Sequence, residues 1–163
     1  MNKILLHKNK KEIIKMLKIK IINNNKKAKA IVEKYTGYKI EEEFFPGAAC
    51  ILPGYGSKPF AFMNHFLWQN LSKEEREAIF LHEECHILYE TTDEGRCDEY
   101  AEEHIGKDVF RNAIIHAIEI EWKRWESKYS DITSKKEFML GSCTNNYSHR
   151  FWLKAYVESL PED

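Results

Sequence analysis

Two histidines four residues apart impose a helical geometry on the middle of this chain. They form the pattern His82-Glu83-x-x-His86, within the stretch AIFLHEECHILY at residues 78–89. In a helix the two imidazoles lie on one face, about 6 Å apart along the axis, so both can bind one metal ion. A zinc ion (Zn²⁺) held this way keeps a position open for water and lowers the pKa of that water towards ~7. The pattern predicts metal ligands at His82 and His86 and a catalytic base at Glu83.

The surrounding residues favour a helix that is largely buried. Residues 72–75 have the form of a capping box, with Ser72 as the N-cap and Glu75 at N3, and no Gly or Pro follows until Gly95. Apolar residues recur at helical spacing beside the histidines: Leu81, Cys85 and Leu88. The alternative is a core helix in which the two histidines are hydrogen-bonded and purely structural.

A second helix is predicted to follow and to carry the third metal ligand. Residues 91–94 form another capping box, with Thr91 as the N-cap and Glu94 at N3, and the helix ends before Gly106. Glu94 falls within the apolar stripe of this helix, and Asp98 falls at its border. A carboxylate on a buried face needs a partner, and zinc is one. We therefore predict Glu94 as the third ligand and Asp98 as the acceptor that orients a ligating histidine. Three residues remain alternative third ligands: Asp93, Asp98 and His104.

Three short antiparallel strands are expected before the motif helix. Residues 38–44 alternate apolar and charged side chains, residues 50–52 are apolar, and residues 58–63 form a further strand. Pro59 predicts that this last strand lies at an edge of the sheet. An exposed edge beside a zinc site can bind an extended peptide, although a loop of the chain can cover it instead.

The N-terminal residues are basic and are predicted to form two helices. Residues 10–22 have an apolar stripe at helical spacing, and residues 26–36 form a second helix that ends at Gly37. Residues 1–39 carry 12 Lys and only two Glu. Nucleic acid is therefore a conceivable partner, but residues 10–36 have no Arg, one aromatic residue (Tyr35) and no known binding motif. A solvated lysine face is the favoured interpretation.

Three further helices are predicted towards the C-terminus. Residues 108–129 form a long one, Ser134 caps a short one that ends at Gly141, and Ser148 caps the last. The polar loop at residues 143–150 offers hydrogen-bond donors for an oxyanion, and the candidates are Tyr147, His149 and Arg150. Ordinary surface polar residues at a helix start are the favoured interpretation of this loop.

Length and composition indicate one folded domain over residues 1–163. We expect a mostly helical α+β domain made of basic N-terminal helices (1–37), a core (38–106) and C-terminal helices (107–163). The hydrophobic content of 43% argues against disorder, and no segment is long enough to span a membrane. The four cysteines show no disulfide-like spacing. A reducing, cytoplasmic location is the simpler expectation.

Two strings of residues resemble a known family. LSKEEREAIFLHEECHIL and EGRCDEYA are similar to the small zinc metallopeptidases of the gluzincin type, including the ImmA/IrrE-like domains. The resemblance covers residues 38–106. It implies a zincin-like fold with His82, His86 and Glu94 as zinc ligands, Glu83 as general base and Asp98 beside the ligands. It also implies a small sheet whose edge strand aligns the substrate.

These observations favour a zinc metallopeptidase that cleaves a peptide or protein substrate. Two alternatives stay open. The first is a zinc-binding regulator without strong catalysis, which acts on a transcription regulator or on DNA. The second is a metal-free helical interaction protein in which the histidines are structural.

Overall fold

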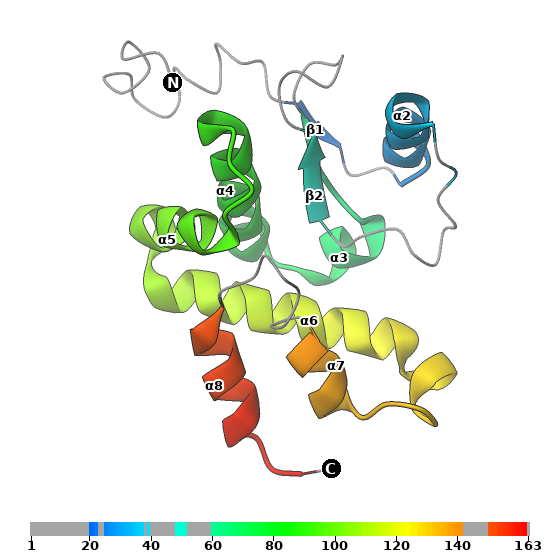
Figure 1. Cartoon of the computed structure of the whole chain (residues 1–163), viewed down its shortest axis with the longest axis vertical. Helices are drawn as coiled ribbons and strands as arrows, with labels where there is room; N and C mark the ends of the chain where they lie inside the picture. Colours follow the sequence, from blue (N-terminus) through cyan, green and yellow to red (C-terminus); the bar gives the residue numbers. More distant parts are fainter. Residues whose placement is uncertain are drawn as a thin grey trace.

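The structure, a computed structural model, describes residues 20–22, 25–37, 39, 48–51, 60–141 and 150–162. These residues are mostly helical and include a small three-stranded sheet. In Figure 1 the sheet and α2 lie to one side of α4, while α6 crosses beneath α4 and α5 and carries the C-terminal helices on its other side. The described part thus confirms the expectation of a mostly helical α+β architecture.

The sheet is mixed, and it corrects two predictions. Its order is β1 (Lys20–Ile22), β3 (Phe60–Met63) and β2 (Ala48–Ile51), with β1 parallel and β2 antiparallel to β3. The expectation of a purely antiparallel sheet was therefore wrong, and so was the edge position of the last strand. β3 is central because its apolar residues are buried on both faces, with Ala61, Phe62 and Met63 at most 2% exposed. A proline just before a strand is compatible with this place, since only a proline inside it would remove a ladder hydrogen bond.

The N-terminal predictions were right in part. Helix α2 (Asn25–Thr36) confirms the helix expected over residues 26–36, and it ends at Gly37, whose φ of 73° suits glycine. Residues 20–22, however, form β1 and not the end of a helix. Pairing with β3 overrides the local helical pattern here, and the β-branched Ile21 and Ile22 suit a strand. The rest of that predicted helix and the strand expected at residues 38–44 lie outside the described residues.

Helix α4 (Lys73–Tyr89) is the centre of the core. Its predicted capping box is present: the Ser72 hydroxyl accepts from the Glu75 backbone N–H, and the Glu75 carboxylate accepts from the Ser72 N–H. Helices α5 (Glu94–Ile105) and α6 (Lys107–Tyr129) pack against α4. A short helix that the sequence did not indicate, α3 (His65–Asn70), leads into α4 and is capped by Asn64.

The C-terminal helices pack on α6 and on each other. Helix α7 (Lys135–Gly141) confirms the capping box at Ser134, whose hydroxyl accepts from the Glu137 N–H. Helix α8 (Phe151–Ser159) packs against α7 and begins after Arg150, which is its N-cap residue in place of the predicted Ser148. Ser148, Tyr147 and His149 lie outside the described residues. The Arg150 side chain forms no cap hydrogen bond with the first turn of α8.

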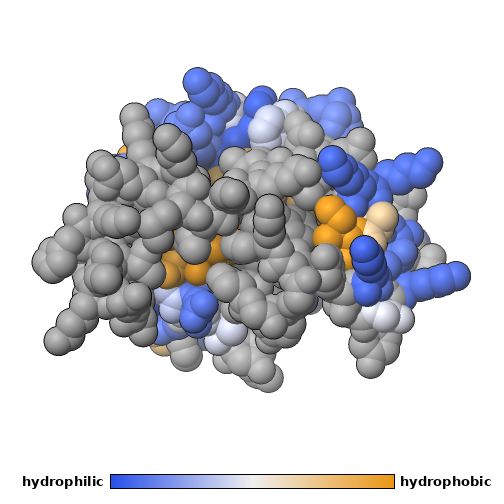
Figure 2. Space-filling view, turned by 90° about the horizontal axis from the view of Figure 1, so that it is seen from above, coloured by the Kyte–Doolittle hydropathy of each residue, from blue (hydrophilic) through white to orange (hydrophobic). Residues whose placement is uncertain are grey.

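Hydrophilic residues are exposed on the described part of the surface. On the face that Figure 2 shows, the described residues in view are mostly hydrophilic, and hydrophobic ones appear in small separate patches. On α2 the side chains of Lys26, Lys27 and Lys34 are exposed, as expected of a solvated lysine face. Among the described helices, none combines the length and the apolar content that crossing a bilayer requires.

Candidate metal centre

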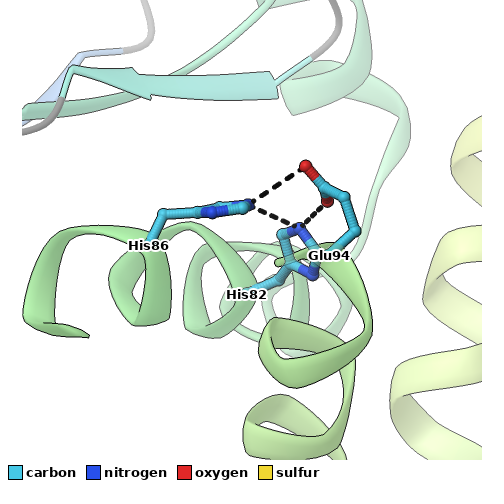
Figure 3. Close-up of side chains that lie close together, drawn as sticks. All are labelled: His82, His86 and Glu94. Atoms are coloured by element: carbon cyan, nitrogen blue, oxygen red, sulfur yellow. Dashed lines mark hydrogen bonds and ion pairs between the residues drawn. The ribbon is translucent and has the colours of Figure 1, made fainter. Parts of the chain in front are cut away.

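The first two predicted ligands come from one face of α4, and the third comes from the first turn of α5. The Nε2 atoms of His82 and His86 lie 3.1 Å apart. The Glu94 carboxylate faces both, with Oε2 at 2.7 Å from Nε2 of His82 and Oε1 at 3.4 Å from Nε2 of His86. Figure 3 shows the three side chains converging on one point, with a strand passing above them. The structure therefore brings together the three residues that the sequence predicted.

The cluster fits a zinc ion by its donor atoms and their spacing. Two imidazole nitrogens and one carboxylate oxygen are the ligand set of zinc sites of the His₂Glu type. Ligand atoms bound tetrahedrally at about 2.0–2.1 Å lie roughly 3.4 Å from one another. The ligand atoms of His82, His86 and Glu94 all lie within 4.8 Å of each other. Small shifts of side chains would bring them around one ion.

The second nitrogen of each histidine is held by an oxygen. Nδ1 of His86 lies 2.8 Å from the carbonyl oxygen of Thr91, in the turn between α4 and α5. Nδ1 of His82 lies 2.7 Å from Oδ1 of Asp98. These contacts leave the Nε2 atoms pointing at Glu94, which is the arrangement that ligating histidines need. Asp98 thus has the position that the sequence predicted for it.

Two contacts to the centre were not predicted. The ring of Phe110, from α6, stacks on the His82 ring with centroids 6.2 Å apart and an angle of 8° between the planes. Arg150 binds Asp98 through Nε at 2.9 Å and Nη2 at 3.1 Å. Phe110 was expected only as part of the long helix at residues 108–129, and Arg150 only as an oxyanion donor. Both contacts link distant parts of the chain, so no local sequence pattern indicates them.

The other proposed third ligands lie elsewhere. Asp93 is the N-cap of α5, and its carboxylate accepts from the Arg96 N–H at 3.1 Å. Thr91 was predicted to be the N-cap, and this prediction was wrong. Its hydroxyl instead accepts from the Asp93 N–H. Asp93 directly precedes the helix, so its carboxylate can accept from a free N–H group of the first turn, that of Arg96. His104 is exposed, with Nδ1 at 2.6 Å from the carbonyl oxygen of Tyr100.

Charge is balanced inside the cluster. Burial lowers the pKa of His82, but contacts with Asp98 and Glu94 outweigh burial and raise that pKa to about 9. For His86, burial again lowers the pKa, while Glu94 and the Thr91 carbonyl raise it above its ordinary value. Burial raises the pKa of Glu94, yet the two histidines hold it well below its usual range. Without metal the cluster is an ion pair network, and a metal ion would replace its protons.

Glu83 lies next to the cluster on α4. Its side chain is buried, with 8% of the residue exposed, and its negative charge contributes to raising the pKa of both His82 and His86. A base that takes a proton from water held at the two imidazoles must lie beside these imidazoles. The buried Glu83 carboxylate has this position. The predicted oxyanion donors Tyr147 and His149 are not described, while Arg150 is committed to Asp98.

Comparison with known proteins leaves the family resemblance as a prediction. No family model, no curated protein and no solved structure matches this chain. The assignment of function therefore depends on the motif and on the geometry of the cluster.

The raised pKa of His82 predicts how the metal-free protein responds to pH. The pKa is 6.5 in a free histidine and about 9 in the folded chain. Protonation of His82 therefore stabilises the fold fully below pH 6.5, and this contribution disappears as the pH rises through 9. We expect the free energy of unfolding of chelator-treated protein to fall by about 3 kcal/mol over this range. Urea denaturation at several pH values measures it, and a His82→Ala variant that shows the same decline would contradict the assignment.

Proposed function

We propose that this protein is a zinc-dependent metallopeptidase. The observation that carries the proposal is the cluster of His82 and His86 from α4 and Glu94 from the first turn of α5, whose ligand atoms lie within 4.8 Å of one another. The pattern His82-Glu83-x-x-His86 then provides a carboxylate next to the first ligand. Zinc-bound water, a base and a carbonyl substrate are the components of peptide hydrolysis.

Each residue has a separate task in this proposal. His82, His86 and Glu94 hold the ion, which when bound polarises the scissile carbonyl and lowers the pKa of water. Glu83 takes the proton of the attacking water and passes it to the leaving amine. Asp98 and the Thr91 carbonyl keep the ring of each histidine in the orientation that presents Nε2.

We further propose that the substrate binds in extended form along β2. This strand lies against α4, and within the described sheet it pairs with β3 on one side only. An outer strand offers backbone N–H and C=O groups to an extended peptide, which gives binding that tolerates many sequences.

The free, buried thiols of Cys85 and Cys97 suit a protein that works in the reducing cytoplasm.

Zinc content tests the metal centre directly. We expect wild-type protein to bind one zinc per chain, and we expect His82→Ala, His86→Ala and Glu94→Ala to weaken binding at least ~100-fold, since each removes a ligand. Mass spectrometry under native conditions gives the stoichiometry, and competition with a chromogenic chelator gives the affinity. Two exposed residues of α5 provide matched controls, Glu99→Ala and His104→Ala, which should retain zinc.

The same samples separate the rival functions. A wild type that binds zinc and cleaves peptides, with cleavage abolished by chelation and restored by zinc, supports the metallopeptidase. Stoichiometric zinc without cleavage of any member of a peptide library would favour a zinc-binding regulator. A wild type that does not bind zinc at all would overturn the metal centre and leave a helical interaction protein.

A further inference from the structure

The C-terminal helix reaches the metal centre through one side chain. Arg150, directly before α8, donates from Nε to Oδ2 of Asp98 and from Nη2 to Oδ1 of the same carboxylate. Oδ1 also lies 2.7 Å from Nδ1 of His82. The Asp98 carboxylate therefore connects Arg150, the N-cap residue of α8, with His82 of the ligand cluster. Arg150 and Asp98 are 52 positions apart in the sequence.

The three side chains of this connection are shielded from water. The side chains of His82, Asp98 and Arg150 are 5%, 6% and 15% exposed. A charged pair at this depth interacts more strongly than a surface pair, and the loss of one partner leaves the other charge uncompensated. Two parallel N–H···O bonds also fix the plane of the carboxylate, which a single bond would not do.

Arg150 holds Asp98 in place for its contact with His82. The two N–H···O bonds from the guanidinium fix the carboxylate in the orientation that puts Oδ1 beside Nδ1 of His82. An oxygen at this nitrogen orients a ligating histidine so that its other nitrogen faces the metal.

The position of Arg150 is set by the docking of α8. Leu153 and Val157, on the inner face of α8, are fully buried, and α8 packs against α7. The guanidinium of Arg111, from α6, lies 4.9 Å from the ring centroid of Trp152. If α8 moved away from these contacts, Arg150 would leave Asp98.

We propose that Arg150 is a positioning residue of the metal centre and that it couples metal binding to the docking of α8. The inference rests on the proposed metal centre. Coupling of this kind is reciprocal: a docked α8 raises the affinity for zinc, and zinc stabilises the docked position of α8 to the same extent. A partner or a modification that displaced α8 would thereby lower the zinc affinity of the centre.

Zinc affinity of three arginine variants tests the first half of this coupling. We expect Arg150→Ala to weaken zinc binding by roughly 10–100-fold, as for partners that orient ligands, and Arg150→Lys to recover part of the loss. Arg124→Ala is the matched control, because Arg124 of α6 also pairs with a carboxylate, with Nη1 3.8 Å from Oε2 of Glu121, and it lies over the ring of Phe66 from α3, whereas Arg111 contacts α8. That variant should bind zinc like the wild type, even if it loses similar stability.

Hydrogen exchange of the full chain tests the second half. In the wild type, saturating zinc should slow exchange of the amides in residues 151–159, and in Arg150→Ala this protection should disappear. Wild-type zinc affinity in Arg150→Ala, or an equal loss in Arg124→Ala, would overturn the coupling while the metal centre stands. Exchange of α8 that zinc does not change would also overturn it. A wild type without zinc binding would remove the metal centre and the coupling together.

Discussion

Replacing Glu83 with Gln is expected to reduce peptide hydrolysis by roughly 10²–10⁴-fold and to leave zinc binding unchanged. Gln has the shape of Glu but cannot accept the proton of the attacking water. Glu83 is not part of the ligand cluster, so its replacement leaves the three ligand atoms in place. The rate is measured with fluorogenic peptides on zinc-loaded protein, and the zinc content of the same samples shows that the centre is intact.

Glu84→Gln is the matched control for this variant. Glu84 follows Glu83 on α4, so its side chain is turned by about 100° around the helix. We expect this control to retain wild-type hydrolysis. Equal rates for Glu83→Gln and the wild type would contradict the assigned base, and equal losses in both variants would indicate a general effect of charge on α4.

Local patterns predicted the parts of the structure that depend on neighbouring residues. The capping box at Ser72, the spacing of His82 and His86, and the end of α5 before Gly106 all involve residues within a few positions of one another. Glu94 was found because a carboxylate on an apolar helix face requires a partner. Glu94 does lie beside the two histidines, because the helix period fixes which side chains share a face, and its role as a ligand stays a prediction.

Nonlocal contacts could not be predicted in the same way. Residues 20–22 have the apolar period of a helix, but pairing with β3 makes them a strand. Pro59 suggested an edge, yet the burial of the following residues places β3 in the centre. The pairing of Arg150 with Asp98 depends on how α8 docks, and docking follows from packing and not from spacing. At residue 93, two capping side chains compete within three positions, and the choice of Asp93 over Thr91 was not evident from either pattern.

Truncation of Phe110 is expected to have the largest effect on stability. The residue is fully buried on α6, so Phe110→Ala should lower the free energy of unfolding by about 3–5 kcal/mol through lost burial and a cavity. Its ring also stacks on His82, so the variant frees one face of a ligand ring. We therefore expect zinc affinity to fall as well, by roughly tenfold, as for other contacts that orient ligands. Urea denaturation of metal-free protein measures the first effect, and chelator competition measures the second.

A second buried residue separates the two effects of that variant. Leu67 of α3 is also buried, and Leu67→Ala should lower the stability by about 2–5 kcal/mol. Since Leu67 lies outside the ligand cluster and outside the helices that carry Arg150, folded Leu67→Ala should bind zinc with wild-type affinity. If both variants lost zinc affinity in proportion to stability, the effect of Phe110 would be explained by folding alone. If only Phe110→Ala lost it, the aromatic contact from α6 would be part of what holds His82 in its ligating position.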